Sequence, residues 1–218
     1  MQFIIKVTSA CNLSCTYCSE GSRKLVNLDI EIYKRFIDEI PKLLMYVGHK
    51  NVDIIWHGGE PLVIGKKWIM EAIEYTNRIL SDYTLTYSIQ TNATLIDNDW
   101  VRIFKEHNFS IGISLDGYKE LHDQYRISQD GEGTYDSIIN NIELLKRQEL
   151  HPSLLMVLNS TDINLDKFWN TLEKLKLNLK IQPVVPIGKA TNQITLARNI
   201  YDSYVTTLKF IFMKLLTS

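Results

Sequence analysis

Two patterns of hydrophobic residues alternate along this chain. Short runs rich in β-branched and aromatic residues, typical of strands, are followed by longer segments whose apolar residues recur every three or four positions, as on one face of a helix. The predicted strands are Gln2–Val7, Asn51–His57, Thr84–Thr91, Phe109–Leu115, His151–Asn159 and Leu179–Val185. The predicted helices are Asp29–Val47, Lys66–Leu80, Asp97–His107, Thr134–Glu149, Asn164–Lys176 and Gln193–Leu216.

This order of elements indicates an α/β fold with a parallel sheet. Six strand–helix units follow one another without a two-residue hairpin signal, which predicts right-handed crossovers between parallel strands. A chain of 218 residues is the size of one domain, and we expect that domain to span residues 1–218. Six units are fewer than the eight of a closed barrel, so the fold we expect is a partial (β/α)6 barrel of TIM type with its helices outside.

Four local features refine this picture. Pro41 lies inside the first predicted helix and predicts a kink or a break there. Asp97 is a plausible helix cap, and the segment Tyr118–Gly133 is predicted to be a long polar loop. The apolar run Leu208–Leu216 is interrupted by two lysines, and we expect it to be the end of a buried helix. The alternative is a docking surface left bare by a missing partner.

Charge and composition exclude several classes of protein. With 24 Lys and Arg against 25 Asp and Glu, the net charge is −1, and the basic residues are scattered, which argues against nucleic acid as the main partner. No run approaches the roughly 18 apolar residues of a membrane span, and Met1–Val7 lacks the length and flanks of a secretory signal. Three cysteines are an odd number for a disulfide framework, so we expect reduced thiols and a cytoplasmic protein.

The three cysteines, Cys11, Cys15 and Cys18, lie in one C-x3-C-x2-C loop directly after the first predicted strand. Thiolates select iron–sulfur clusters or zinc among biological metals. A structural zinc site needs a fourth ligand, and the nearest histidine, His49, lies far along the chain. Three cysteines in one loop fit a cubane cluster with one iron left open for another ligand, which we favour over zinc and over three buried structural cysteines.

Polar and glycine-rich motifs follow the other predicted strands. They are Gly58-Gly59-Glu60-Pro61, Gln90-Thr91-Asn92, Ser114-Leu115-Asp116-Gly117 and Pro186-Ile187-Gly188. The carboxyl ends of the strands in a (β/α) barrel share one rim, where functional residues gather. The two glycines of the first motif allow close approach of backbone to a ligand, although an ordinary turn is the alternative. We therefore expect one face of the molecule to carry the chemistry.

Taken together, the cysteine loop, with Tyr17 before its last cysteine, and these strand-end motifs resemble the radical S-adenosylmethionine (SAM) superfamily over residues 1 to about 190. The resemblance implies that Cys11, Cys15 and Cys18 hold a [4Fe–4S] cluster whose open iron is chelated by SAM. One electron, from a donor of flavodoxin or ferredoxin type, then cleaves SAM to a 5′-deoxyadenosyl radical that abstracts hydrogen from a substrate.

The same resemblance implies the residues that contact SAM: Tyr17, Gly58, Gly59, Glu60, Gln90, Asn92, Ser114, Arg126 and Ile187. Gly58 and Gly59 would present carbonyls to its amine, while Glu60 would hold the loop or the ligand. Ser114 and Arg126 would hold its carboxylate, which a hydroxyl and a guanidinium suit. Gln90 and Asn92 would face SAM or substrate. The Tyr17 backbone and the region of Ile187 would meet the adenine. No catalytic acid or base is identified; His57 and the pair His122-Asp123 are open between structural and functional roles.

Within the superfamily, the motif set most resembles the branch that modifies peptides and proteins, which includes anaerobic sulfatase-maturating enzymes and SPASM- or twitch-type peptide maturases. Formylglycine formation in a sulfatase is one reaction this implies, on a peptide or protein substrate. Those relatives usually carry a C-terminal cysteine-rich domain with auxiliary clusters, whereas this chain has no cysteine after Cys18. Either the chain is truncated, which the apolar final helix favours, or it is a minimal member. A truncated homologue that binds SAM or a peptide without turnover is the alternative function.

Overall fold

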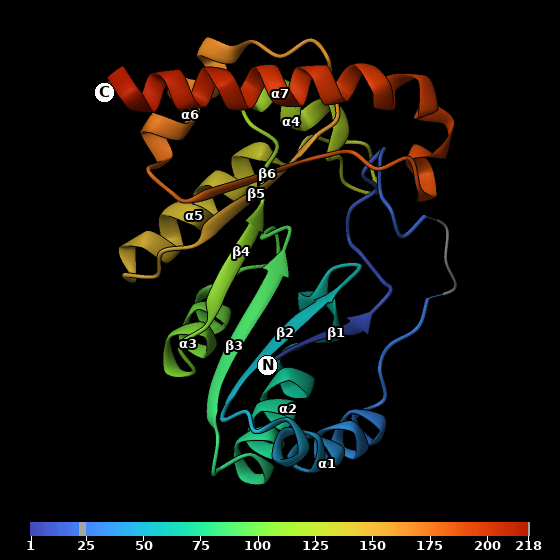
Figure 1. Cartoon of the computed structure of the whole chain (residues 1–218), viewed down its shortest axis with the longest axis vertical. Helices are drawn as coiled ribbons and strands as arrows, with labels where there is room; N and C mark the ends of the chain where they lie inside the picture. Colours follow the sequence, from blue (N-terminus) through green and yellow to red (C-terminus); the bar gives the residue numbers. More distant parts are fainter. Residues whose placement is uncertain (22–24, 218) are drawn as a thin grey trace.

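One parallel six-stranded sheet organises the protein (Figure 1). The computed structural model describes residues 1–21 and 25–217, with the side chains of these residues apart from 192–198. The strands are β1 (Gln2–Thr8), β2 (Asn51–Gly58), β3 (Thr84–Thr91), β4 (Ser110–Ser114), β5 (Ser153–Leu158) and β6 (Leu179–Pro183). Their order in the sheet is their order in the chain, and every neighbouring pair is parallel. The predicted fold class, an open partial barrel, is confirmed.

Helices connect the strands at nearly the predicted positions. They are α1 (Ile30–Val47), α2 (Lys66–Ile79), α3 (Asn98–Glu106), α4 (Lys119–Tyr125), α5 (Tyr135–Arg147), α6 (Leu165–Leu175) and α7 (Ile194–Thr217), with short 3-10 helices η1 (Pro61–Ile64) and η2 (Gly188–Gln193). Asp97 caps α3 as predicted, since its side chain accepts a hydrogen bond from the amide of Trp100. Because each crossover has the same sense, α1, α2, α3 and α5 follow one side of the curved sheet (Figure 1).

The two faces of the sheet differ in polarity, as the strand sequences require. On β2, Val52, Ile54 and Trp56 are at most 1% exposed, whereas the alternating Asp53 and His57 are half-buried on the other face. A large core cluster fills the space between the sheet and its helices, and the Trp56 ring stacks on Tyr87 with ring centroids 5.5 Å apart. Packing of the helices on this face of the sheet fixes the positions of the carboxyl ends of the strands.

Three local predictions were wrong or incomplete. The helix α1 runs without a break through Pro41. The segment predicted as a long loop contains α4, a helix of seven residues that buries Leu121 and His122 and is too short to show a clear periodicity. The end of α7 is not buried: Phe212 is 61% exposed and Leu216 is 66% exposed. From residue 199 onward, where the side chains of α7 are described, Ile200 and Thr207 are buried against the rest of the protein while Phe212 and Leu216 are not.

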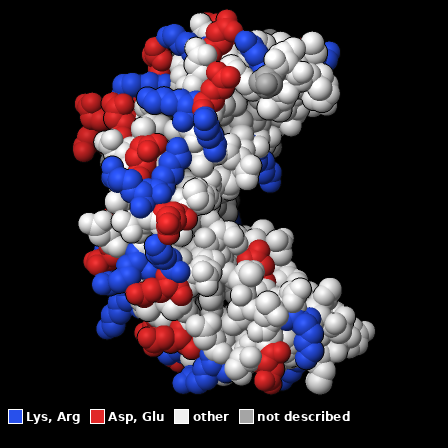
Figure 2. All heavy atoms as spheres, turned by 90° about the vertical axis from the view of Figure 1, so that its left-hand side faces the viewer, with Lys and Arg blue, Asp and Glu red and all other residues white. Residues whose placement is uncertain are grey.

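Charged side chains of both signs intermingle over the helical side of the molecule, whose outline is hollowed on the opposite flank (Figure 2). The view shows no continuous basic surface on this face, in agreement with the scattered lysines and arginines of the sequence. None of the helices in the described ranges has the length and apolar character that crossing a membrane requires.

Candidate active site

The carboxyl ends of the strands surround a cavity of about 190 Å³. Eleven of the twelve residues predicted to bind the cluster or SAM line it: Cys11, Cys15, Tyr17, Cys18, Gly58, Gly59, Glu60, Gln90, Asn92, Ser114 and Arg126. These residues come from five separate segments of the chain, and the parallel strands bring them together because every strand ends at the same rim.

The cysteine loop leaves β1 at Thr8 and is held by backbone contacts with the segment after α4. The amide of Ser14 donates to the carbonyl of Ile127 (2.8 Å), and the amide of Thr16 donates to that of Tyr125 (2.9 Å). The side chain of Gln129 donates to the carbonyl of Leu13 at 3.0 Å. The loop is therefore fixed by its surroundings between Cys11 and Cys18.

All three cysteines carry free thiols that are partly exposed. Burial raises the pKa of the Cys11 thiol to about 11, and burial likewise raises the pKa of Cys15, against the opposing effect of the nearby Arg126. Both thiols are therefore protonated at neutral pH in the protein alone. Ligation of a metal centre requires their deprotonation, so loading of the site releases protons.

The donor set fits an iron–sulfur cluster better than a single metal ion. Within the described residues, no three His, Cys, Asp or Glu side chains converge closely enough to hold one ion. The three thiols instead stand around the cavity, and a cluster, which is wider than one ion, takes ligands that are spread in this way. Thiols are the ligands such clusters select.

The turn after β2 packs directly on the cysteine loop. The amide of Gly59 donates to the carbonyl of Thr8, and the amide of Glu60 donates to that of Ala10, each at 2.8 Å. At Gly58, where φ is +138°, an added Cβ would lie 2.2 Å from the Thr8 carbonyl oxygen. The sequence suggested that these glycines allow close approach of a ligand; the structure shows that they allow close approach of the cysteine loop.

Glu60 is 1% exposed and holds the turn rather than reaching into the cavity with a free carboxylate. It accepts hydrogen bonds from the amide of Leu62 (3.0 Å), the hydroxyl of Thr91 (2.7 Å) and the amide of Asn92 (2.7 Å). Burial raises its pKa to about 7 despite these donors. Of its two predicted roles, holding the loop is the one that its contacts support.

Two amide side chains at the end of β3 connect the site across the sheet. Asn92 donates to the Asn12 side chain at 2.9 Å, and its amide nitrogen lies 3.9 Å from the sulfur of Cys11. Gln90 donates to the hydroxyl oxygen of Ser114 at 3.1 Å. Because that oxygen accepts from Gln90, the hydroxyl proton of Ser114 remains available to a ligand in the cavity.

Arg126 follows α4 and is 8% exposed at the cavity wall. Its Nε donates to a carboxylate oxygen of Asp116 at 2.9 Å. Burial opposes the charge of the guanidinium, but the ion pair with Asp116 outweighs it and raises the pKa of Arg126. A buried cation beside a cavity is suited to binding an anionic group of a ligand.

Ile187 is the one predicted site residue outside the cavity. It is 51% exposed and follows β6. The neighbouring η2 segment does reach the cysteine loop, since the amide of Lys189 donates to the carbonyl of Cys18 at 2.9 Å. The contact of the Ile187 region with a bound adenine stays a prediction.

The sequence left the roles of His57 and of the pair His122-Asp123 open between structure and function. His57 lines the cavity, and its Nδ1 accepts a hydrogen bond from the Gly58 amide at 2.8 Å, which places the proton of the neutral ring on Nε2. His122 is fully buried, with Nδ1 accepting from the amide of Asp116, so it is structural. Asp123 accepts from the first amide of α5 and pairs with Lys119, which is also structural.

Sequence reasoning missed several residues that line the cavity: Leu13, Ser19, Glu20, Thr91, Leu155, Val157 and Gln182. Leu155, Val157 and Gln182 lie on the face of the sheet away from the helices, as the alternation along β5 and β6 shows. The apolar run of β5 hides this alternation in the sequence, because residues on both of its faces are hydrophobic.

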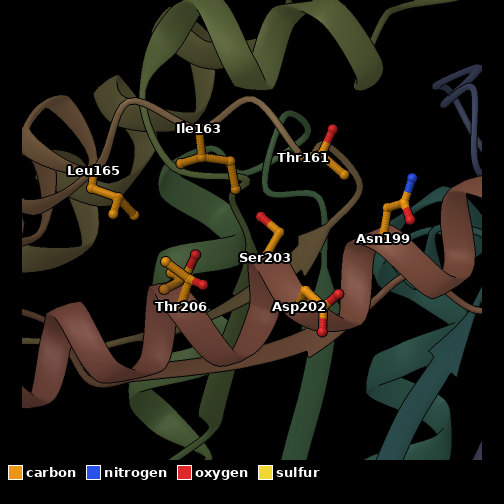
Figure 3. A pocket seen from close by; sticks show the side chains of 8 residues that line it. Thr161, Ile163, Leu165, Asn199, Asp202, Ser203 and Thr206 are labelled. Carbon is orange, nitrogen blue, oxygen red and sulfur yellow. The ribbon is translucent and has the colours of Figure 1, made fainter.

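A larger cavity of about 370 Å³ lies between α7 and the segment that joins β5 to α6 (Figure 3). Hydroxyl groups of Thr161, Ser203 and Thr206 line it with the carboxylate of Asp202. It contains no thiol and no buried charged side chain among its lining residues. The smaller cavity at the cysteine loop is therefore the candidate active site.

Comparison with known proteins agrees with this choice. The sequence model of the radical SAM superfamily matches residues 5–175. A cysteine-type anaerobic sulfatase-maturating enzyme of Clostridium novyi is 36% identical over 189 residues, covering 80% of this chain and 48% of that enzyme. A serine-type anaerobic sulfatase-maturating enzyme of Klebsiella aerogenes is 32% identical, covering 84% of this chain and 46% of that enzyme.

Among solved structures, native anSMEcpe with bound AdoMet and Kp18Cys peptide superimposes with a TM-score of 0.77 at 25% identity. The match covers 84% of this chain and 51% of that one. The chain thus spans about half the length of the relatives it matches.

Proposed function

This chain belongs to the radical SAM superfamily, and we propose that residues 1–218 form one radical SAM core domain that acts on a side chain of a peptide or protein. Its cofactors are S-adenosylmethionine and an iron–sulfur cluster. The proposal for the cluster is the [4Fe–4S] type, held by Cys11, Cys15 and Cys18. When bound, the cluster and SAM supply a 5′-deoxyadenosyl radical that abstracts hydrogen.

The residues around the cavity divide the binding of SAM among them. Arg126, paired with Asp116 through Nε, and Ser114, whose hydroxyl proton is available, bind its carboxylate. Gly58 and Gly59 bind its amine through their carbonyl groups, on a turn that Glu60 holds.

Gln90 and Asn92 complete the wall next to SAM or substrate. The backbone of Tyr17 and the region of Ile187, which leads directly into η2, face the adenine.

The substrate we propose is a peptide or protein in which a cysteine or serine side chain is oxidised to formylglycine. Relatives of both the cysteine type and the serine type are about a third identical to this chain over the matched region, so identity alone favours neither side chain. The electron comes from a protein of flavodoxin or ferredoxin type. Three free thiols at a site that requires reduction fit the cytoplasm.

The observation that carries this proposal is the single cavity that unites three thiols with Ser114 and Arg126. The test is anaerobic reconstitution with iron and sulfide, followed by dithionite and SAM. We expect 5′-deoxyadenosine by liquid chromatography, and conversion of a sulfatase-derived peptide that carries cysteine or serine at the target position. SAM binding by a well-formed cluster without any 5′-deoxyadenosine would overturn the proposal and indicate a binding protein instead.

A further inference from the structure

Asp116 is the fully buried hub of a hydrogen-bond network beside the active site. One carboxylate oxygen, Oδ2, accepts from the phenol of Tyr17 and from Nε of Arg126 (2.9 Å). The other oxygen, Oδ1, accepts from the backbone amide of Val157 at 3.0 Å. One carboxylate thus joins the cysteine loop, the residue after α4 and strand β5.

The same network also contacts the main chain of Arg126. The amide of Asp116 donates to Nδ1 of His122 at 3.1 Å, and Nε2 of His122 lies 3.0 Å from the hydroxyl oxygen of Thr134. That hydroxyl in turn donates to the carbonyl of Arg126 at 2.9 Å. Asp116 is therefore connected to Arg126 both directly, through the side chain, and indirectly, through its main chain.

This arrangement leaves two of the three guanidinium nitrogens of Arg126 available to a ligand. Within the part of the chain that the structure describes, Nη1 and Nη2 of Arg126 carry no hydrogen bond, while Nε is occupied by Asp116. The guanidinium carbon also lies 5.4 Å from the centre of the Tyr17 ring. Arg126 lines the cavity, and Asp116 itself does not. A planar fork with two free nitrogens matches a carboxylate.

We propose that Asp116 is a positioning residue that orients the free edge of Arg126 for binding the carboxylate of SAM. This inference rests on the proposed function. Asp116 acts through its neighbours, because it has no exposed surface with which to touch a ligand. Without its charge, Arg126 loses the partner that compensates its burial and that sets its direction.

The first experiment uses Asp116→Asn in the full chain, reconstituted anaerobically. We expect iron and sulfide content close to the wild type and a SAM dissociation constant about tenfold higher, measured by equilibrium dialysis. The change that SAM causes in the electron paramagnetic resonance spectrum of the reduced cluster should require correspondingly more SAM. The matched control is Asp130→Asn, an exposed aspartate in the loop between α4 and α5, which should bind SAM as the wild type does.

A double-mutant cycle separates positioning from general destabilisation. If Asp116 acts through Arg126, then Asp116→Asn should weaken SAM binding no further in an Arg126→Ala background. Two losses that multiply would overturn the proposal, as would unchanged SAM affinity in an iron-loaded Asp116→Asn protein. Thermal unfolding of each variant shows whether affinity and stability change together.

Tyr17→Phe provides a second route if Asp116→Asn takes up too little iron. It removes one hydrogen bond to Asp116 but keeps the buried charge pair, and should raise the SAM dissociation constant about threefold. Unchanged affinity in this variant would then overturn the proposal. If the wild-type protein binds no SAM, the proposed function is wrong. If the wild type binds SAM and the variants bind it equally well, only this inference is wrong.

Discussion

A Cβ atom on Gly59 would lie 2.3 Å from the carbonyl oxygen of Ala10, the residue before the first cysteine. Real Cβ atoms do not approach an oxygen so closely, so any larger side chain at Gly59 must displace the backbone that leads into the cysteine loop. The two glycines of this turn thus allow the backbone next to Cys11 to pack closely on it, whether or not a ligand is bound.

Gly59→Ala should therefore impair assembly of the cluster. We expect reduced iron and sulfide content per chain after anaerobic reconstitution, with a weaker visible absorbance of the cluster. Gly48→Ala is the matched control: it strains the left-handed end of α1 by about 1 kcal/mol but meets no atom within 4 Å, and should load iron normally. Normal iron content in Gly59→Ala would show that the loop tolerates the displacement.

Removal of one thiol tests the ligand assignment. Cys15→Ala leaves only Cys11 and Cys18, because the chain has no other cysteine, and two thiolates cannot complete the site. We expect loss of the cluster and of SAM cleavage, with a circular dichroism spectrum like that of the wild type. Cleavage of SAM by this variant would refute the assignment of Cys15 as a ligand.

Glu60→Gln should destabilise the protein by about 1–3 kcal/mol at neutral pH, because one of the backbone amides that now meets a carboxylate oxygen would face an NH₂ group. Urea denaturation measures the change.

The pH dependence gives Glu60 a second signature. Burial raises its pKa from 4.5 to about 7, so the folded state binds more protons than the unfolded state between these values. The contribution of Glu60 to stability must then fall as pH rises from about 4.5 to about 7. Glu60→Gln should lack this slope, and parallel pH curves for the variant and the wild type would contradict the assignment.

His122 should act in the opposite direction. Burial lowers its pKa from 6.5 to about 4, so the unfolded state binds more protons between these values. The contribution of His122 to stability is complete above pH 6.5 and is lost as pH falls toward 4. His122→Asn, which keeps an acceptor for the Asp116 amide, should unfold with a flatter pH dependence in this range. Urea midpoints at pH 4.5 and pH 7 measure the difference.

The arrangement of strands and helices followed from short-range patterns. The period of apolar residues in Thr84–Thr91 predicted β3 to the residue, because a strand buried on one face must alternate. α4 was missed because seven residues show only one apolar position on the buried side, Leu121. The burial of α7 was overestimated because an apolar sequence reports what a residue prefers, and not whether another element is present to cover it.

Site residues that lie close together in the sequence, or at the ends of predicted strands, could be predicted. Contacts between distant parts of the chain could not. Three cysteines in one loop, and polar residues at the ends of strands, are visible in sequence. The pairing of Tyr17 with Asp116 joins residues 99 positions apart, and no periodicity relates them. The contacts of Glu60 with Thr91 and Asn92 join residues on different strand ends, more than 30 positions apart, and they favour its role in holding the loop.

The strands β1 and β6 are the two edges of the sheet and do not pair with each other. At their carboxyl ends, the two edges are bridged by the chain that follows them, since the amide of Lys189 after β6 donates to the carbonyl of Cys18 after β1. The last cysteine of the loop therefore lies on the seam between the first and the last strand, and its position depends on both edges of the sheet.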